Sequence, residues 1–240
     1  MTNYTQLLCL EDSYARECEC NVVAVNGKEI VLDQTVFYPR GGGQPSDKGK
    51  IVSSGGSEFL VLNVLKKEGQ IIHELEMPAT FAAGDKVHCT IDWTRRYKLM
   101  RMHTAAHVLG ATMYNDLGVL ISGNQLEEEQ SRFDFTMENF DRAKFEQIVE
   151  KVNTVLSQNI EIKTYTLPRE EALKLPGVIK LAGALPPSIS HLRIVEIPGV
   201  DLQADGGTHV RNLNEVGKMN LLKVDNKGKD NRRIYFTLSP

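Results

Sequence analysis

The stretch "DWTRRYKLMRMHTAAHVLGATMYND", residues 92–116, has the apolar pattern of a long helix and contains two histidines four residues apart. Asp92 or Thr94 can cap its N-terminus. Side chains four residues apart lie on the same face of a helix, so His103 and His107 can present two imidazoles to one point. The pair is therefore either half of a metal site or two histidines that hydrogen bonds satisfy at the surface or in the core.

A third ligand has to come from elsewhere in the chain, and the segment "DLQADGGTHVRN", residues 201–212, is the best source. Gly206 and Gly207 allow unusual backbone geometry, and Asp205 lies four residues before His209. These residues predict a site of three histidines and one carboxylate, or of three histidines with a water in the fourth position. A turn with an incidental histidine is the alternative.

Several classes of protein are disfavoured. In the zinc metalloprotease motif a glutamate follows the first histidine as general base, whereas Thr104 has that place here. No apolar run approaches the roughly 20 residues that a membrane span needs, and the start of the chain lacks the features of a secretory signal. The net charge of -3 gives no whole-molecule basic field. We therefore expect a cytosolic protein.

The four cysteines are Cys9, Cys18, Cys20 and Cys89. A disulfide framework is disfavoured in a reducing cytosol for a chain of this length. The spacing of Cys18 and Cys20 is not that of a zinc knuckle. We expect unpaired thiols on or near strands.

Residues 20–90 have the pattern of a small β-barrel. Alternating apolar positions surround the turn dipeptide Asn26-Gly27, and the pattern repeats around Glu68-Gly69. Short strands separated by glycine turns at this spacing are typical of a small barrel.

The second half of the chain mixes helix and strand. "NFDRAKFEQIVEKVNTVLSQN", residues 139–159, predicts an amphipathic helix whose apolar stripe faces a core. That stripe consists of Phe145, Ile148, Val149, Val152, Val155 and Leu156. A loop and a strand are expected in 118–135, and further strands at 160–167, 192–199, 218–226 and 232–238. This pattern predicts an α+β fold with helices against an antiparallel sheet, and two domains, 1–90 and 91–240.

The glycine cluster "YPRGGGQPSDKG", residues 38–49, is neither a Walker loop nor a dinucleotide fingerprint, because the required Lys-Ser/Thr and the following helix are missing. Its bare backbone amides and Gln44 suit close contact with a polar ligand or a catalytic centre. A plain connection between strands is the alternative.

Two local basic clusters stand out, "RRYKLMR" at 95–101 and "KVDNKGKDNRR" at 223–233. Either cluster can contact RNA, and either is explained as well by a solvated charged face.

Taken together, four stretches resemble the editing domain of alanyl-tRNA synthetase and, more closely, its free-standing relatives, the medium-sized AlaX trans-editing proteins. The matching residues are "LDQTVFYPRGGGQPSDKG" (32–49), "HTAAHVLG" (103–110), "SGNQLEEEQSRFDF" (122–135) and "ADGGTHV" (204–210). Four motifs in the family's order are far more specific than any one of them.

The resemblance implies an N-terminal small β-barrel that carries the glycine-rich loop and packs on a two-layer α+β zinc-binding editing domain. It implies a zinc-dependent hydrolase with one Zn²⁺ per chain, which deacylates mischarged Ser-tRNA(Ala) and Gly-tRNA(Ala) in the cytoplasm. The implied partner is mischarged alanine tRNA, and neither a membrane nor a protein partner is evident. A non-catalytic tRNA-binding module with a structural zinc site is the alternative, which the carboxylate at Asp205 keeps open.

The family's site residues carry over position by position. The implied metal ligands are His103, His107, His209 and Asp205. The implied catalytic residues are these three histidines with Gly42, Gly43 and Gln44. The implied substrate-binding residues are Arg40, Gly41, Gly123, Asn124, Gly206, Gly207 and Thr208. Backbone amides of the two glycine segments are expected to stabilise the developing oxyanion.

The chain departs from the family pattern at two positions. Asp205 falls where many relatives have a cysteine, and a carboxylate is a harder and weaker zinc ligand than a thiolate. Ile121 falls where the synthetase domain tends to have a polar side chain. We therefore expect Asn124 and the glycine-rich loop to bear more of the recognition of serine.

Overall fold

The computed structural model describes residues 4–137, 142–178 and 189–240. The chain divides into two compact units, Met1–Tyr97 and Lys98–Pro240, and the division falls within the long helix α2 (Trp93–Leu117). In the described part of the chain, no helix combines the length and the apolar character that crossing a bilayer requires.

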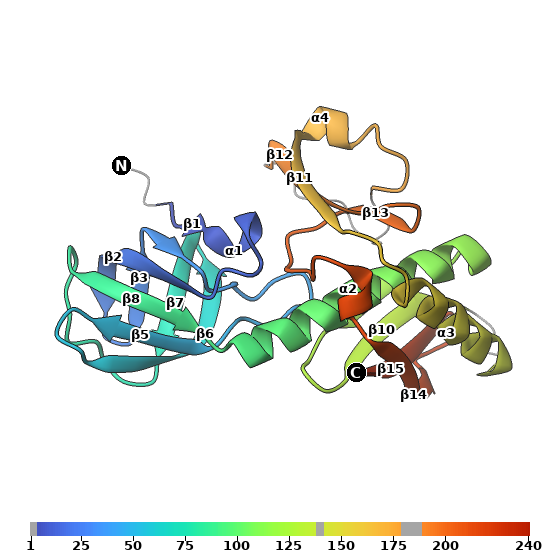
Figure 1. Ribbon diagram of the computed structural model, residues 1–240, viewed down its shortest axis with the longest axis horizontal. Coiled ribbons are helices and arrows are strands. Elements are labelled where there is room, and N and C mark those ends of the chain that lie inside the picture. The colour runs from blue at the N-terminus through green and yellow to red at the C-terminus, as the bar shows by residue number, and fades with distance from the viewer. Residues whose placement is uncertain (1–3, 138–141, 179–188) are drawn as a thin grey trace. The chain divides into compact units, whose positions relative to one another are not determined.

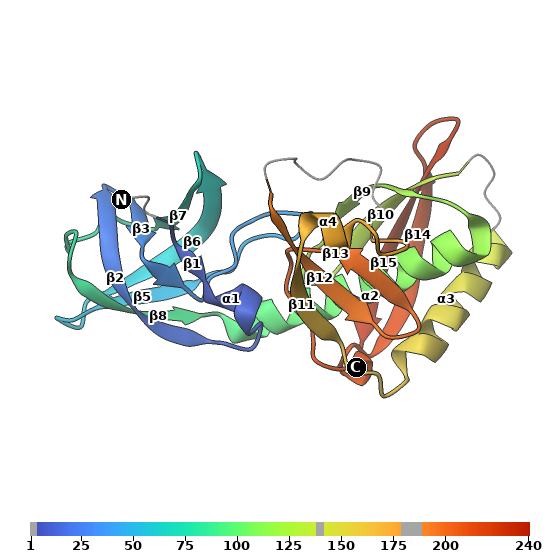
Figure 2. The same cartoon turned by 90° about the horizontal axis from the view of Figure 1, so that it is seen from above.

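The first unit is built on a closed six-stranded barrel (Figures 1 and 2). The prediction of a small N-terminal β-barrel is confirmed. Two very short strands, β1 (Gln6–Leu7) and β4 (Gln34–Thr35), pair in parallel, and α1 (Leu8–Glu11) follows β1. Around the barrel the order is β2 (Glu17–Asn26), β3 (Glu29–Leu32), β7 (Gln70–Leu75), β6 (Glu58–Lys67), β5 (Gly49–Ser53) and β8 (Lys86–Ile91).

The two turn dipeptides close hairpins where the sequence predicts them. Asn26 pairs with Glu29 at the end of the β2–β3 hairpin, and Gly27 in the turn has φ +61°. Between β6 and β7, Glu68 and Gly69 have φ of 51° and 81°. The Glu68-Gly69 turn has positive φ at both positions, and the turn of Gly27 and Lys28 has it at the first position. Both kinds of two-residue turn match the twist of the flanking strands.

The barrel interior is filled by apolar side chains that alternate with outward-facing polar ones along the strands. Cys20 and Cys89 belong to this core, and Cys18 packs against it. The four cysteines are free thiols, as expected from the sequence.

A buried ion pair joins the base of the glycine-rich loop to the first turn of α2. The Arg96 guanidinium is fully buried, and its Nε donates to both carboxylate oxygens of Asp47 at 3.0 Å. Its terminal nitrogens donate to the carbonyls of Val36 and Ser13, while Asp47 also accepts from the backbone N–H of Tyr38. The prediction that Arg96 belongs to an RNA-binding cluster is therefore wrong, because its guanidinium is buried and forms an ion pair with Asp47.

Replacing Asp47 by alanine should destabilise the first unit by about 3–5 kcal/mol, because Arg96 would be left as an unpaired buried charge. The measurement is the free energy of unfolding in urea. The matched control is the double variant Asp47→Leu with Arg96→Met, which removes both charges and should lose less stability than Asp47→Ala alone. A larger loss in the double variant would contradict the prediction.

The second unit contains two antiparallel sheets and the helices that cover them, so the predicted α+β class is confirmed (Figures 1 and 2). The larger sheet has the order β14 (Lys218–Asn226), β15 (Asn231–Ser239), β10 (Ser131–Thr136) and β9 (Ile121–Gln125). The smaller sheet has the order β11 (Lys163–Pro168), β12 (His191–Ile197) and β13 (Asp201–Ala204). The remaining elements are α3 (Arg142–Leu156), α4 (Arg169–Ala172) and a 3-10 turn η1 (Leu213–Glu215).

Helix α2 begins as the sequence predicts. The carboxylate of Asp92 accepts from the backbone N–H of Arg95 at 3.1 Å, so Asp92 and not Thr94 is the N-terminal cap. Further along, the helix runs through Gly110 without a break, and a Cβ on this glycine would lie 2.8 Å from Cδ1 of Ile121. The missing side chain therefore lets α2 approach β9 closely.

The rest of the second unit differs from the expectation only in detail. In α3, Phe145, Ile148, Val152 and Leu156 are buried, whereas Val149 and Val155 are half-buried. The predicted first residues of this helix, 139–141, lie outside the described residues. The segment expected to be a loop and a strand forms two paired strands, β9 and β10. The sequence does not predict β9, because a bulge beside Gly123 interrupts the alternation of its side chains.

Candidate metal centre

Four of the predicted site residues converge in the second unit. His103 and His107 come from α2, and Asp205 and His209 from the segment that follows β13. Ligating atoms of all four lie within 4.8 Å of one another. The imidazoles are almost inaccessible, with exposed fractions of 7% for His103, 6% for His107 and 2% for His209, whereas the Asp205 side chain is 16% exposed. Such a group could hold a metal ion.

The carboxylate of Asp205 lies at the middle of the group. Its Oδ2 is 3.0 Å from Nε2 of His209, and its Oδ1 is 3.6 Å from Nε2 of His103 and 4.0 Å from Nε2 of His107. Three imidazole Nε2 atoms therefore face one carboxylate. A cation between them would meet nitrogen and oxygen donors from four side chains.

The opposite ring nitrogens of two histidines have their own partners. Nδ1 of His107 lies 2.8 Å from Oδ2 of Asp201, and Nδ1 of His209 lies 3.1 Å from the hydroxyl of Thr104. Partners of this kind fix the orientation of a ligating imidazole. The sequence predicts neither of these orienting roles. Thr104 stands out there only because it has the place of the metalloprotease glutamate, and no spacing points to Asp201.

The loop between Asp205 and His209 is tied down by Arg193 on β12. Its guanidinium donates to the carbonyl of Asp205 at 3.2 Å and to that of Gly207 at 3.0 Å. The backbone N–H of Gly207 donates to Oδ2 of Asp205 at 2.6 Å. The N–H of Gly207 already has an acceptor, which contradicts its expected use as an oxyanion donor. The neighbouring Gly206 is exposed.

Burial and the contacts among the four side chains together set the protonation of the site. Burial lowers the pKa of His103 well below 6.5 and that of His209 to about 4, because the imidazolium form loses its hydration. Burial opposes ionisation of Asp205, but the neighbouring His103 and the hydrogen bond from His209 bring the pKa of Asp205 well below its usual value. Neutral imidazoles and an ionised carboxylate are the forms that bind a metal ion.

The glycine-rich loop belongs to the first unit. Gly42 and Gly43 form its exposed tip, with φ of 58° and 88°, a conformation that favours glycine. Gly41 and Gln44 close the turn with reciprocal backbone hydrogen bonds of 3.1 Å and 2.9 Å. The side chain of Gln44 is buried, whereas Arg40 is exposed.

Gly123 and Asn124 lie on β9 in the second unit. Asn124 is directly opposite Phe133 of β10, and directly opposite residues share a face of the sheet. Because Phe133 is buried, half-buried Asn124 lies on the inward face. A Cβ on Gly123 would lie 3.3 Å from Oδ2 of Asp134.

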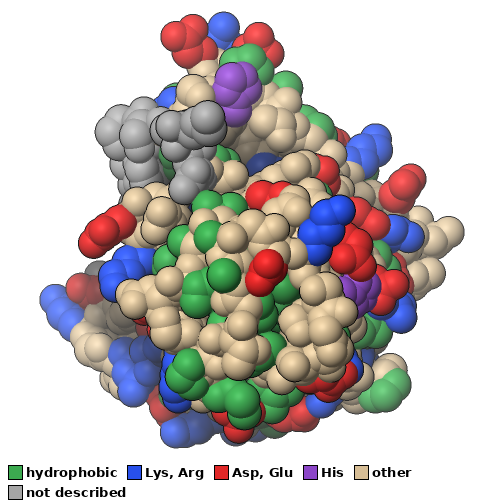
Figure 3. All heavy atoms as spheres, turned by 90° about the vertical axis from the view of Figure 1, so that its left-hand side faces the viewer, with side chains coloured by type: hydrophobic (Ala, Val, Ile, Leu, Met, Phe, Trp, Pro, Cys, Tyr) green, Lys and Arg blue, Asp and Glu red, His purple; other side chains and the backbone are tan. Residues whose placement is uncertain are grey.

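The predicted basic clusters are largely paired with acceptors. Lys98 forms an ion pair with Glu129, and Arg233 binds Asp134 at 2.6 Å and 2.8 Å. Arg232 is buried, so it does not belong to an RNA-binding surface either. The face seen in Figure 3 likewise carries acidic and basic side chains together. Exposed members of the second cluster include Lys227 and Lys229.

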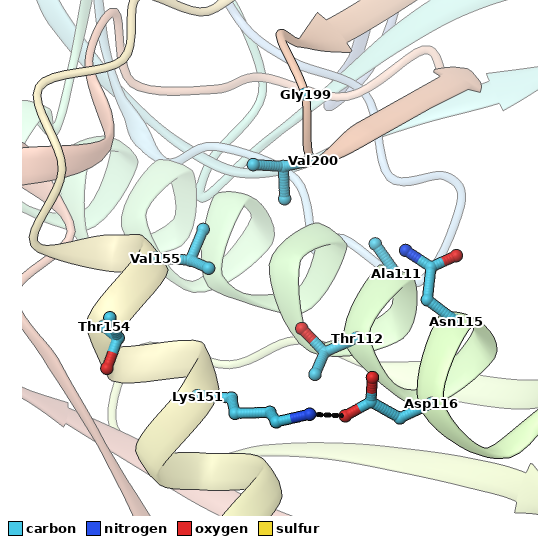
Figure 4. Close-up of a pocket in the computed structure, with 9 residues that line it drawn as sticks. All are labelled: Ala111, Thr112, Asn115, Asp116, Lys151, Thr154, Val155, Gly199 and Val200. Carbon is cyan, nitrogen blue, oxygen red and sulfur yellow. Dashed lines mark hydrogen bonds and ion pairs between the residues drawn. The ribbon is translucent and has the colours of Figure 1, made fainter.

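A separate cavity of about 330 Å³ lies between α2, α3 and the turn before β13 (Figure 4). Lys151 and Asp116 form an ion pair of 2.7 Å in its wall. Its lining consists of Ala111, Thr112, Asn115, Asp116, Lys151, Thr154, Val155, Gly199 and Val200. None of the four converging residues lines it, so it is not the cavity of the candidate metal centre.

Comparison with known proteins identifies the family. Residues 4–95 match the family described as tRNA synthetases class II (A), and residues 192–235 match the threonyl and alanyl tRNA synthetase second additional domain. The protein named alanyl-tRNA editing protein AlaX-M of Saccharolobus solfataricus is 46% identical over 98% of this chain and 100% of its own length. The protein of the same name from Methanosarcina barkeri is 47% identical over 98% of this chain and 99% of its own length. The chain belongs to the AlaX-M family.

The chain also matches part of a larger enzyme. The alanine–tRNA ligase of Pyrococcus furiosus is 37% identical over 97% of this chain but only 26% of its own length. This match and the second additional domain relate AlaX-M proteins to the editing domain of alanyl-tRNA synthetase. The region 192–235 contains Asp205 and His209, so the family match includes the loop half of the candidate metal centre.

Replacing Thr104 by valine should weaken metal binding about 10–100-fold, because the nearly isosteric side chain no longer orients His209. The measurement is competition for Zn²⁺ with a chromophoric chelator. The matched control is Thr112→Val on the same helix, whose hydroxyl donates to the carbonyl of Val108 in the preceding turn. Equal affinities of the Thr104→Val variant and the unmodified protein would contradict the orienting role.

Proposed function

We propose that this chain is a zinc-dependent aminoacyl-tRNA deacylase that hydrolyses Ser-tRNA(Ala) and Gly-tRNA(Ala) in trans. The observation that carries the proposal is the convergence of three imidazoles and one carboxylate in a member of a family whose relatives are named alanyl-tRNA editing proteins. The full-length match to those relatives supports action on a tRNA charged by a separate enzyme.

The donor set suits zinc. Zn²⁺ in proteins is bound by histidine nitrogen and carboxylate oxygen in four-coordinate sites, and three histidines with Asp205 supply four such donors. Burial lowers the pKa of His103 and His209 and so favours their neutral form, whereas the lowered pKa of Asp205 favours its ionised form. When bound, zinc would supply polarisation of the ester carbonyl or of the attacking water.

The chain's own residues provide positioning. Asp201 and Thr104 hold the rings of His107 and His209, and Arg193 holds the loop carbonyls. Thr104 stands where metalloproteases have a glutamate, and its hydroxyl faces His209. An aminoacyl ester is already activated, so a placed water and an oriented carbonyl supply most of what its hydrolysis needs.

Exposed backbone at Gly206 supports close approach of a substrate to the loop. A Cβ at this position would meet no heavy atom within 4 Å, so the surface beside Asp205 is open. In the first unit, Gly42 and Gly43 present an exposed turn, and Arg40 adds a positive charge beside it. We assign Gly206 to the aminoacyl end and the glycine-rich loop to contact with the tRNA or its ester.

Removing two ligands with the double variant His103→Ala, His209→Ala should reduce deacylation of Ser-tRNA(Ala) at least about 100-fold. The measurement is release of radiolabelled serine from mischarged tRNA. The matched control is His191→Ala, an exposed histidine of the same unit outside the cluster, which should keep full activity. Full activity of the double variant would end the proposal.

Discrimination between substrates is expected to involve Asn124. An amide that hydrogen-bonds the serine hydroxyl would be lost in Asn124→Ala, so hydrolysis of the seryl ester should fall about 10-fold while that of the glycyl ester changes little. The measurement is the ratio of kcat/KM for the two substrates. Gln125→Ala, the exposed neighbour on β9, is the control. Equal losses on both substrates would refute this role for Asn124.

One observation favours a second function. Asp205 completes a set of four protein donors, and structural zinc sites are closed in this way, whereas catalytic sites keep a position open. The alternative is a tRNA-binding module without hydrolytic activity. Bound zinc together with tRNA binding but no deacylation of either ester would favour it.

A further inference from the structure

We propose that Cys18, Cys20 and Cys89 form a second metal site, which takes a thiophilic closed-shell cation inside the β-barrel. The shared chemistry is three thiolate sulfurs around one soft ion, with Zn²⁺ and Cu⁺ as the two candidate occupants. This site is separate from the histidine and aspartate group, with which it has no residue in common.

The barrel architecture brings the three sulfurs together. Cys18 and Cys20 are two residues apart on β2, so their side chains point to the same face of the strand. Cys89 lies on β8 directly opposite Cys18, and directly opposite residues also share a face. Because β2 and β8 close the barrel, this shared face is its interior.

The distances fit one shared ion. Sγ of Cys20 lies 3.2 Å from Sγ of Cys18 and 3.5 Å from Sγ of Cys89. All three sulfurs lie within 4.8 Å of one another. A zinc–sulfur bond of about 2.3 Å with tetrahedral angles places the ligand sulfurs about 3.8 Å apart, so small side-chain movements would complete the site. Thiols packed only as small apolar groups would sit nearer the ordinary contact distance of about 4 Å.

The burial of the three thiols is graded. Cys20 is 3% exposed and Cys89 is fully buried, whereas Cys18 is half-buried. A cation and a fourth ligand therefore reach the cluster from the side on which Cys18 lies.

The spacing of the cysteines along the sequence does not reveal this cluster, for a physical reason. A zinc knuckle draws its ligand pair from a tight turn, whereas Cys18 and Cys20 are on an extended strand. The third sulfur comes from a strand 69 residues after Cys20. A cation here would join β2 to β8 and stabilise the folded barrel, because metal binding to a folded site adds to folding stability.

The test is titration of the metal-free, reduced full-length protein with Cd²⁺ under anaerobic conditions. A sulfur-to-cadmium charge-transfer band in the ultraviolet reports thiolate ligation, and the histidine and aspartate group has no sulfur that could produce it. The band should saturate at one ion per chain. It should persist in the double variant His103→Ala, His209→Ala and disappear in Cys18→Ser.

Cys9→Ser is the matched control, because it removes a buried thiol of the same unit that lies outside the cluster. It should keep the band. Displacement of Cd²⁺ by Zn²⁺ or by Cu⁺ then tells which of the two ions the site prefers. Absence of the band from the unmodified protein, or an unchanged band in Cys18→Ser, would overturn the proposal.

A second measurement covers the case in which Cys18→Ser does not fold. In the unmodified protein, half-buried Cys18 should be alkylated by iodoacetamide, and Zn²⁺ or Cd²⁺ should slow this reaction at least about 10-fold, with the site located by mass spectrometry. Equal rates with and without metal would contradict the site. Neither readout uses deacylation, so failure here leaves the proposed function untouched.

Discussion

The second unit depends on one constraint, the burial of an ionisable carboxylate among three imidazoles. An isolated buried charge is costly, and the group is tolerable because each member has a partner: Asp205 accepts from the backbone N–H of Gly207, and the outer nitrogens of His107 and His209 face Asp201 and Thr104. These contacts join α2 to a loop about 100 residues later, which places β13 and its sheet beside the helix. A cation would satisfy the inward donors of the same set.

Rigidity is distributed unevenly around the donors. His103 and His107 share one continuous helix, so their separation is set by the helix itself. Asp205 and His209 lie on a loop, whose backbone does not fix their separation as a helix does. Arg193 restrains this loop by donating hydrogen bonds to two of its carbonyls. The first unit shows the same principle in another form, since buried Arg96 and Asp47 fix the base of the glycine-rich loop. In both units a long-range polar contact anchors a loop whose turn is closed by local hydrogen bonds.

Local patterns were enough to predict the barrel and the α+β class. Alternation and turn dipeptides have a range of a few residues, so Gly27 and Gly69 revealed their hairpins, and the spacing of His103 and His107 revealed a shared helix face. The missed features are all contacts between distant segments. No short-range pattern marks Asp201 as the partner of His107, Arg96 as the buried partner of Asp47, or Cys89 as the neighbour of Cys20. Family resemblance supplied the pairing of His209 with the helix, which spacing alone left open.

The carboxylate at Asp205 divides between two oxygens what a cysteine at that position would combine on one sulfur. Its Oδ2 is engaged with the N–H of Gly207 and with His209, while Oδ1 points toward His103 and His107. One oxygen thus anchors the loop and the other is left to ligate, whereas a cysteine offers a single sulfur for both tasks. A carboxylate binds a soft ion more weakly than a thiolate does, and the hydrogen bond from Gly207 couples the position of this carboxylate to the loop conformation. A substrate that shifts the exposed backbone at Gly206 would act through this coupling on the donor set itself.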